Sequence, residues 1–204
     1  MRMQMVLIAF LMGALVAAGH AAPASKTQIV FLGTGMPRPS PERSGPAVCI
    51  VVNETPYLVD FGPGVVRRAA AAAEKGISGC APTKIKIVFC THLHSDHTAG
   101  LSDLFLTPAV VGRGAPLVLY GPAGLADMAR HIRGAYVKDI DVRVHGLEHG
   151  NAAAYEMTVH EIKPGVVYRD TNVTVTAFLV KHGSWDQAFR LPLGHTRPQH
   201  RDLR

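Results

Sequence analysis

The sequence is poor in several features that would set it apart from an ordinary globular protein. Its three cysteines are an odd number without paired spacing, so they define no disulfide framework. Cys49 and Cys90 instead lie in apolar runs, where small buried side chains are expected. No internal repeat occurs, which excludes solenoid architectures. With 204 residues, 48% hydrophobic and only 18% charged, the chain suits one folded domain and not a disordered one.

Long basic runs are also missing, although the net charge is +6. Lysine and arginine are scattered along the chain, and the tail holds several of the arginines, namely Arg190, Arg197, Arg201 and Arg204. Proteins that bind nucleic acid usually gather such residues into a run or a patch. We therefore expect nucleic acid to be an unlikely partner.

A stretch long enough to span a membrane is missing as well. Residues 1–22 combine Arg2, the apolar segment Met5–Ala18 and small residues, which is the pattern of a secretory signal. The apolar segment is shorter than the roughly 20 residues of a span, so an N-terminal anchor is the less favoured alternative. We predict cleavage after Ala21 or Ala24, export to the periplasm or the medium, and no stable membrane span afterwards.

Apolar periodicity predicts strands and helices that alternate at first, with strands dominating later. Strands are expected over Thr27–Gly33, Ala47–Asn53, Pro56–Asp60, Lys84–Thr91, Pro116–Tyr120, Asp141–Leu147, Glu156–Lys163 and Asn172–Lys181. Helices are expected over Val65–Lys75 and Ala123–Arg133. This order indicates an α/β sandwich of sheets with helices outside.

The segment His92-Leu93-His94-Ser95-Asp96-His97 places four potential metal ligands within six residues, directly after an apolar strand. Imidazole and carboxylate groups suit zinc, manganese or iron. In an extended segment, residues two apart face the same way, so His92 and His94 can bind one ion. Asp96 and His97 are expected to open a helix and to face a second ion. A histidine-rich surface loop without metal is the alternative.

HLHSDH resembles the HxHxDH signature of the metallo-β-lactamase-fold hydrolases. The segments FLGTG at 31–35, LVDFGPG at 58–64 and KHGSW at 181–185 add to this resemblance. Together they are most similar to the branch that includes tRNA 3′-processing endonucleases, phosphodiesterases and arylsulfatase-like hydrolases. The resemblance covers Gln28–Phe189 and implies one α/β domain over 27–189, an αββα sandwich whose second half is incomplete in this chain.

The resemblance also implies a site for one or two metal ions. The implied ligands are His92, His94, Asp96, His97 and His182. Asp96 would in addition act as a general base on water, and Asp60 would accept a hydrogen bond from a ligand histidine and fix its tautomer. Zn²⁺ is the expected cofactor, with Mn²⁺ or iron as alternatives. On spacing alone a histidine after an apolar strand is more often structural, but the KHGSW context favours His182 as a ligand.

The remaining histidines lack a comparable context. His131, His145, His149 and His160 are expected to be surface or core residues without a role in the site. The turn at Gly33–Gly35 is interpreted as a tight structural turn, because glycine permits the backbone angles that such a turn needs. Backbone N–H groups that bind an anion are the alternative at this turn.

The tail Arg190–Arg204 departs from the family pattern, which continues with a G-D-T turn and a late histidine. Its Pro-, His- and Arg-rich sequence reads unlike a strand. If one base is dropped after the codon for Phe189, a permissible back-translation reads GYRLGTPDRSIVIS, which is similar to the family's strand, turn and strand. We therefore hypothesise that Arg190–Arg204 is read out of frame and that His195 and His200 are not metal ligands.

The sequence thus predicts an exported metal-dependent hydrolase of small ester substrates, either phosphodiesters or sulfate esters. Alternatives are a tRNA 3′-processing endoribonuclease, a β-lactamase or lactonase, and a non-catalytic remnant that binds at most one metal. For the chain as written, the missing second half of the sandwich predicts low stability. The missing ligands predict at most one tightly bound ion and little or no turnover.

Resequencing the gene across codons 189–205 tests the reading-frame hypothesis. A surplus base, with a corrected frame that runs on to a G-D-T turn, is the expected result. Confirmation of the present frame would contradict it.

Overall fold

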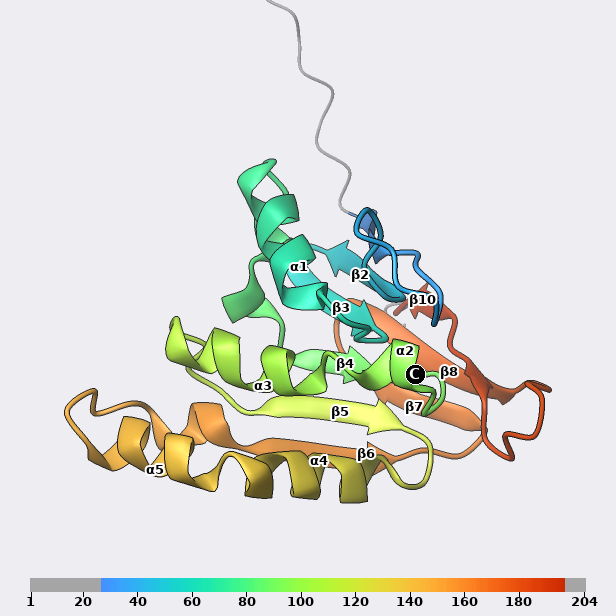
Figure 1. Ribbon diagram of the computed structural model, residues 1–204. Helices are drawn as coiled ribbons and strands as arrows, with labels where there is room; N and C mark the ends of the chain where they lie inside the picture. Colours follow the sequence, from blue (N-terminus) through green and yellow to red (C-terminus); the bar gives the residue numbers. More distant parts are fainter. Residues whose placement is uncertain (1–26, 197–204) are drawn as a thin grey trace, which may run out of the picture.

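The computed structural model describes residues 27–196. The predicted signal at 1–22 and the last part of the tail, with His200, lie outside this range. No helix among the described residues is long and apolar enough to cross a membrane. Two sheets lie face to face, and the helices gather on one side of the larger sheet (Figure 1).

The larger sheet has six strands in the order β1-β2-β3-β4-β5-β6. Its strands are β1 (Thr27–Gly33), β2 (Ala47–Val52), β3 (Thr55–Val59), β4 (Ile87–Phe89), β5 (Leu117–Gly121) and β6 (Met157–Glu161). The first three pair antiparallel, whereas β3, β4, β5 and β6 run parallel. Parallel strands end at the same edge of a sheet, so the loops after β3 and β4 meet there.

The helices cover one face of this sheet. They are α1 (Val65–Glu74), α2 (Ser95–Thr98), α3 (Leu101–Val110), α4 (Leu125–Ala135) and α5 (Val137–His145). Buried residues of α1, α3 and α4 form one core with inward residues of the strands, for example Ala69, Leu104 and Leu125 with Leu58 and Val88. Burial of this apolar surface is the main force that holds the helices on the sheet.

The smaller sheet covers the opposite face of the larger one. It contains β7 (Gly165–Arg169), β8 (Val173–Leu179), β9 (Phe189–Arg190) and β10 (Leu193–His195), with β8 paired to the other three. Its inward residues, such as Val175 and Phe189, pack with Tyr57 and Phe89 of the larger sheet. On its outer face Val166 and Phe178 are 58% and 52% exposed, so the fourth layer of an αββα sandwich is absent from the described range.

A polar bridge joins the two sheets inside this apolar layer. The hydroxyls of Tyr57 on β3 and Tyr168 on β7 both donate to Asp170 Oδ2, the latter at 2.8 Å. Asp170 Oδ1 accepts from the backbone N–H groups of Asn172 and Val173, each at 2.8 Å. The carboxylate therefore satisfies the hydroxyls of the buried Tyr57 and the half-buried Tyr168, and it also shapes the turn that leads into β8.

The predicted strand over Asp141–Leu147 is wrong, because α5 occupies Val137–His145. The segment alternates apolar and polar residues, but its packing has the helical period: Ile140 is buried, and Val144 packs beside it on the same small core. Arg143 also pairs with Asp139 one turn earlier, at 3.0 Å. Tertiary contact and a helical ion pair thus outweigh the local strand pattern.

The start of the tail also differs from expectation, since it forms β9 and β10 on β8. Leu191 is buried and Leu193 packs on the same intersheet core, which gives the segment apolar contacts that its composition does not reveal. The hypothesis about its reading frame concerns the gene and stays a prediction.

We expect Asp170→Asn to destabilise the fold by about 1–3 kcal/mol at pH 7, because an amide cannot accept all four hydrogen bonds. Burial raises the pKa of Asp170, but the hydrogen bonds to its carboxylate outweigh burial and lower the pKa overall. The difference in free energy of unfolding between wild type and Asp170→Asn is therefore fully present above the unfolded-state pKa of about 4. It is lost as the pH falls through the lower folded-state pKa. Urea unfolding of wild type and Asp170→Asn at neutral and at acidic pH measures this difference. The same difference in unfolding free energy at both pH values would contradict the prediction.

Candidate metal centre

The candidate site lies at the edge where the parallel strands end. Asp60 follows β3, and Thr91 and His92 follow β4. Backbone hydrogen bonds hold these strand ends together, from Asp60 N to Phe89 O at 2.8 Å and from Cys90 N to Tyr120 O at 2.7 Å. The chain that leaves β8 reaches the same edge, since Phe189 N donates to Thr91 O at 2.9 Å.

Three histidines meet at this edge. The ring nitrogens of His92, His94 and His182 that face one another all lie within 4.8 Å. His92 Nε2 is 2.9 Å from His94 Nδ1, and His182 Nε2 is 3.2 Å from the same atom. His92 is buried, whereas His94 and His182 are exposed beside a hollow of about 440 Å³. The structure thus brings together residues that are 90 positions apart in the sequence.

The geometry of these nitrogens fits a zinc-like ion. In a tetrahedral site with Zn–N bonds of about 2.0–2.1 Å, neighbouring ligand nitrogens lie about 3.4 Å apart. The observed separations of 2.9 and 3.2 Å need only a small outward shift of the rings to reach this value. Burial, followed by the charges of His97 and His182, lowers the pKa of His92 to about 4. His92 is therefore neutral at pH 7, which is the form that binds metal.

Asp96 and His97 lie beside this cluster on the first turn of α2. The ring of His97 is 4.2 Å from that of His92 between centroids, and Asp96 Oδ2 is 3.7 Å from His97 Nε2. Burial lowers the pKa of His97, but the hydrogen bond and charge of Asp60, together with Asp96, raise it overall. In the described residues the three-histidine cluster does not include these two side chains, so a second metal position stays a prediction.

Asp60 connects both parts of the site. Its carboxylate accepts from His97 Nδ1 at 2.8 Å, from Thr91 N at 2.8 Å and from Thr91 Oγ1 at 2.9 Å. Thr91 Oγ1 also lies 2.9 Å from His92 Nδ1. Asp60 has a φ of +59°, a left-handed region that non-glycine residues enter rarely. Sequence reasoning missed Thr91, whose only signal is its place directly before the motif.

Trp185 is a second residue that sequence reasoning missed. The turn from His182 to Trp185 closes with a backbone hydrogen bond of 3.1 Å, and Gly183 supplies a φ of +57° within it. This turn directs the indole N–H of Trp185 to His94 Nε2 at 2.6 Å. His94 Nε2 must then be unprotonated, whereas a metal ion on Nδ1 requires the proton on Nε2. The Trp185 contact and metal binding by His94 Nδ1 are therefore alternatives.

The other expectations for histidine and glycine can also be compared with the structure. His131, His145, His149 and His160 are all exposed and lie outside the cluster, as expected. His195 is on β10, where its ring contacts Thr27. At the Gly33–Gly35 turn, Gly35 N donates to Ser44 O at 2.8 Å, which favours the structural interpretation over an anion site.

Two facing sheets with helices outside, and a histidine cluster at the strand ends, define the metallo-β-lactamase fold. The chain belongs to this superfamily, since the family model described as "Beta-lactamase superfamily domain" matches residues 55–200. The fold class and the family predicted from the sequence are thus confirmed.

The similar proteins include ribonucleases. A ribonuclease Z of Mycobacterium marinum is 35% identical over 158 residues, which are 76% of this chain and 54% of the relative. A ribonuclease Z of Pyrococcus abyssi is 35% identical over 145 residues, 68% of this chain and 45% of that protein. The crystal structure of human tRNase Z, short form, superimposes with a TM-score of 0.62 at 25% identity and covers 82% of this chain and 63% of that one. The chain spans about half the length of the curated relatives it matches.

These relatives overturn the expectation that nucleic acid is an unlikely partner, because a ribonuclease by its name acts on RNA. That expectation rested on the scattered positions of lysine and arginine in the sequence. The fold brings some of them together: Arg43 and Arg68, 25 positions apart, line one hollow beside β1, together with Glu42. A patch made by folding leaves no run in the sequence.

Trp185 is the only tryptophan in the sequence, so its fluorescence reports on the site. We expect Zn²⁺ titration of EDTA-treated protein to change this emission, because metal on His94 Nδ1 removes the acceptor of the indole N–H. His92→Ala should weaken the apparent Zn²⁺ affinity about tenfold or more. His160→Ala, which removes an exposed histidine outside the cluster, is the matched control. Identical Zn²⁺ titration curves for wild type, His92→Ala and His160→Ala would contradict metal binding by the histidine cluster.

Proposed function

We propose that this chain is a metal-dependent hydrolase that cleaves phosphodiester bonds in RNA. The observation that carries the proposal is the cluster of His92, His94 and His182, which offers three convergent imidazole nitrogens at the edge of the sheet. Three imidazoles suit Zn²⁺, with Mn²⁺ or iron as alternatives. The ribonuclease Z relatives support RNA as the substrate class.

A metal ion held by these histidines would lower the pKa of water towards about 7 and polarise the phosphoryl oxygen under attack. Asp96 would take the proton of the attacking water. Its half-buried position in the first turn of α2, at the border of an open pocket, supports this role. Asp60 orients the ring of His97, and Thr91 links that carboxylate to His92. These contacts fix the ligand rings before substrate arrives.

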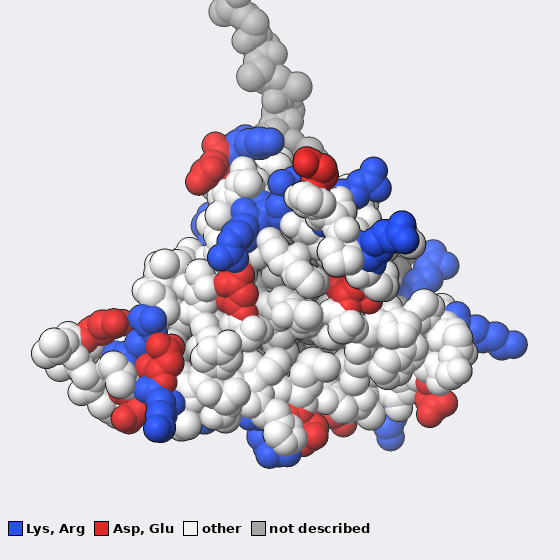
Figure 2. Space-filling model, in the orientation of Figure 1, with Lys and Arg blue, Asp and Glu red and all other residues white. Residues whose placement is uncertain are grey.

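The charge of the surface suits a polyanionic substrate. The full sequence carries a net charge of +6. Figure 2 shows lysine and arginine side chains over α1 and beside β2, where acidic side chains lie among them, and others near α5. Arg43 and Arg68 line the hollow beside β1. Positive charge near the site favours association with the phosphate backbone of RNA.

Export is a separate part of the proposal and rests on the signal pattern of residues 1–22 alone. It determines where the enzyme would meet RNA and leaves the chemistry of the site unchanged. An exported enzyme would act on RNA outside the cytoplasm.

Hydrolysis of bis(p-nitrophenyl) phosphate and of a short oligoribonucleotide, with added Zn²⁺ or Mn²⁺, tests the function. We expect activity that depends on metal, that falls to background in His92→Ala and that persists in His160→Ala. Asp96→Asn should also lose activity while it keeps the Zn²⁺ response of Trp185 fluorescence. Equal signals from wild type and His92→Ala would identify a non-catalytic remnant, and hydrolysis of a β-lactam reporter alone would indicate a lactamase.

A further inference from the structure

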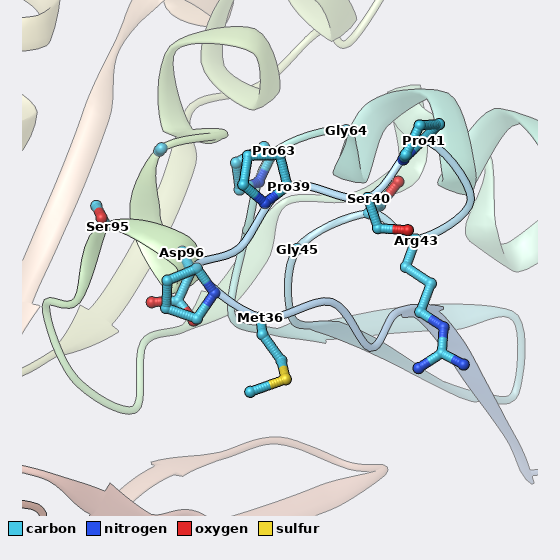
Figure 3. A pocket seen from close by; sticks show the side chains of 13 residues that line it. Met36, Pro39, Ser40, Pro41, Arg43, Gly45, Pro63, Gly64, Ser95 and Asp96 are labelled. Atoms are coloured by element: carbon cyan, nitrogen blue, oxygen red, sulfur yellow. The ribbon is translucent and has the colours of Figure 1, made fainter.

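A pocket of about 480 Å³ lies next to the metal centre, between the loop that follows β1 and the start of α2. Asp96 and Ser95 border it on one side and Arg43 on the opposite side, with Pro39 and Pro63 between them (Figure 3). It therefore extends from a residue of the metal-binding motif to a cationic side chain.

The wall of this pocket is fixed to the metal-binding segment. Gly45 N donates to Pro63 O and Gly62 N donates to Pro46 O, each at 3.0 Å, so the two loop segments are joined twice. A Cβ atom on Gly62 would lie 2.3 Å from the backbone oxygen of Asp96, which leaves no room for a side chain there. The wall and α2 are thus in direct backbone contact, and the pocket exists before any ligand binds.

The chemistry of the lining changes along the pocket. Met36, which is 74% exposed, and the prolines give its middle an apolar surface. Arg43 is exposed and makes no ion pair with any residue in the range 27–196. A ligand that fits has a flat, poorly hydrated body and a negative group beyond it. A nucleotide has this form, since every base offers a flat face and each phosphate binds arginine well.

We propose that this pocket binds the nucleotide next to the scissile phosphate of single-stranded RNA. Its base lies against Met36, Pro39 and Pro63, and its outer phosphate pairs with Arg43, while the scissile phosphate faces Asp96. The proposal rests on the proposed function, because it places the cleaved bond at the metal centre.

Binding without catalysis is the first test. The probe is a fluorescein-labelled single-stranded oligoribonucleotide, titrated by anisotropy in EDTA against the full chain. Arg43→Gln should weaken the Kd about tenfold, as the loss of a charge-assisted hydrogen bond predicts. It should also reduce the slope of log K against log salt by about 0.7, the value for one phosphate contact on a single strand. Arg169→Gln, an exposed arginine on β7, is the matched control and should keep the wild-type Kd.

The second test compares two substrates in the presence of metal. The ratio of kcat/KM for the oligoribonucleotide to that for bis(p-nitrophenyl) phosphate, which has no second phosphate, should fall about tenfold in Arg43→Gln. An unchanged Kd and an unchanged ratio would overturn the pocket assignment. If the wild type hydrolyses neither substrate, the proposed function fails, and the binding test in EDTA still decides the pocket.

Discussion

The site depends on the carboxylate of Asp60. It accepts hydrogen bonds from the backbone and the hydroxyl of Thr91 and from the ring of His97, and so joins the ends of β3 and β4 to the helix α2. A buried carboxylate in such a position is stable only when these donors satisfy it. The left-handed backbone of Asp60 aims the side chain between the two loops. Without this carboxylate the backbone hydrogen bonds between the loops would remain, but Thr91 and His97 would lose the acceptor that orients their side chains.

The same edge of the sheet explains why the histidine cluster and the neighbouring pocket belong to one surface. Phe61 N donates to His97 O, and Gly100 N donates to Phe61 O, each at 2.9 Å, so the loop after β3 is bonded to the C-terminal end of α2. The next residues, Gly62 and Pro63, then form a wall of the pocket. One backbone segment therefore positions the helix that carries Asp96 and His97 on one side and a wall of the pocket on the other. A substrate that reaches both sides would have its charged group placed by residues far apart in the sequence.

The sequence predicts much of this arrangement because its signals are local. The strand Thr27–Gly33 has the predicted bounds, and the histidines of the motif follow a strand as their spacing indicates. The helix over Val137–His145 was missed, because the core contacts of Ile140 and Val144 arise only when α3 and α4 are in place. Trp185 and the shared hollow of Arg43 and Arg68 also depend on contacts between distant segments. Residue spacing alone does not contain that information.

The central claim is that His92, His94 and His182 hold a metal ion. Metal analysis of protein purified by gel filtration after expression with added zinc tests it most directly. The account predicts about one tightly held ion per chain, as three imidazoles support. It also predicts that the ion is lost in His182→Ala and retained in His145→Ala, which removes an exposed histidine outside the cluster. A wild-type protein without stoichiometric metal, or equal metal content in the two variants, would contradict the account.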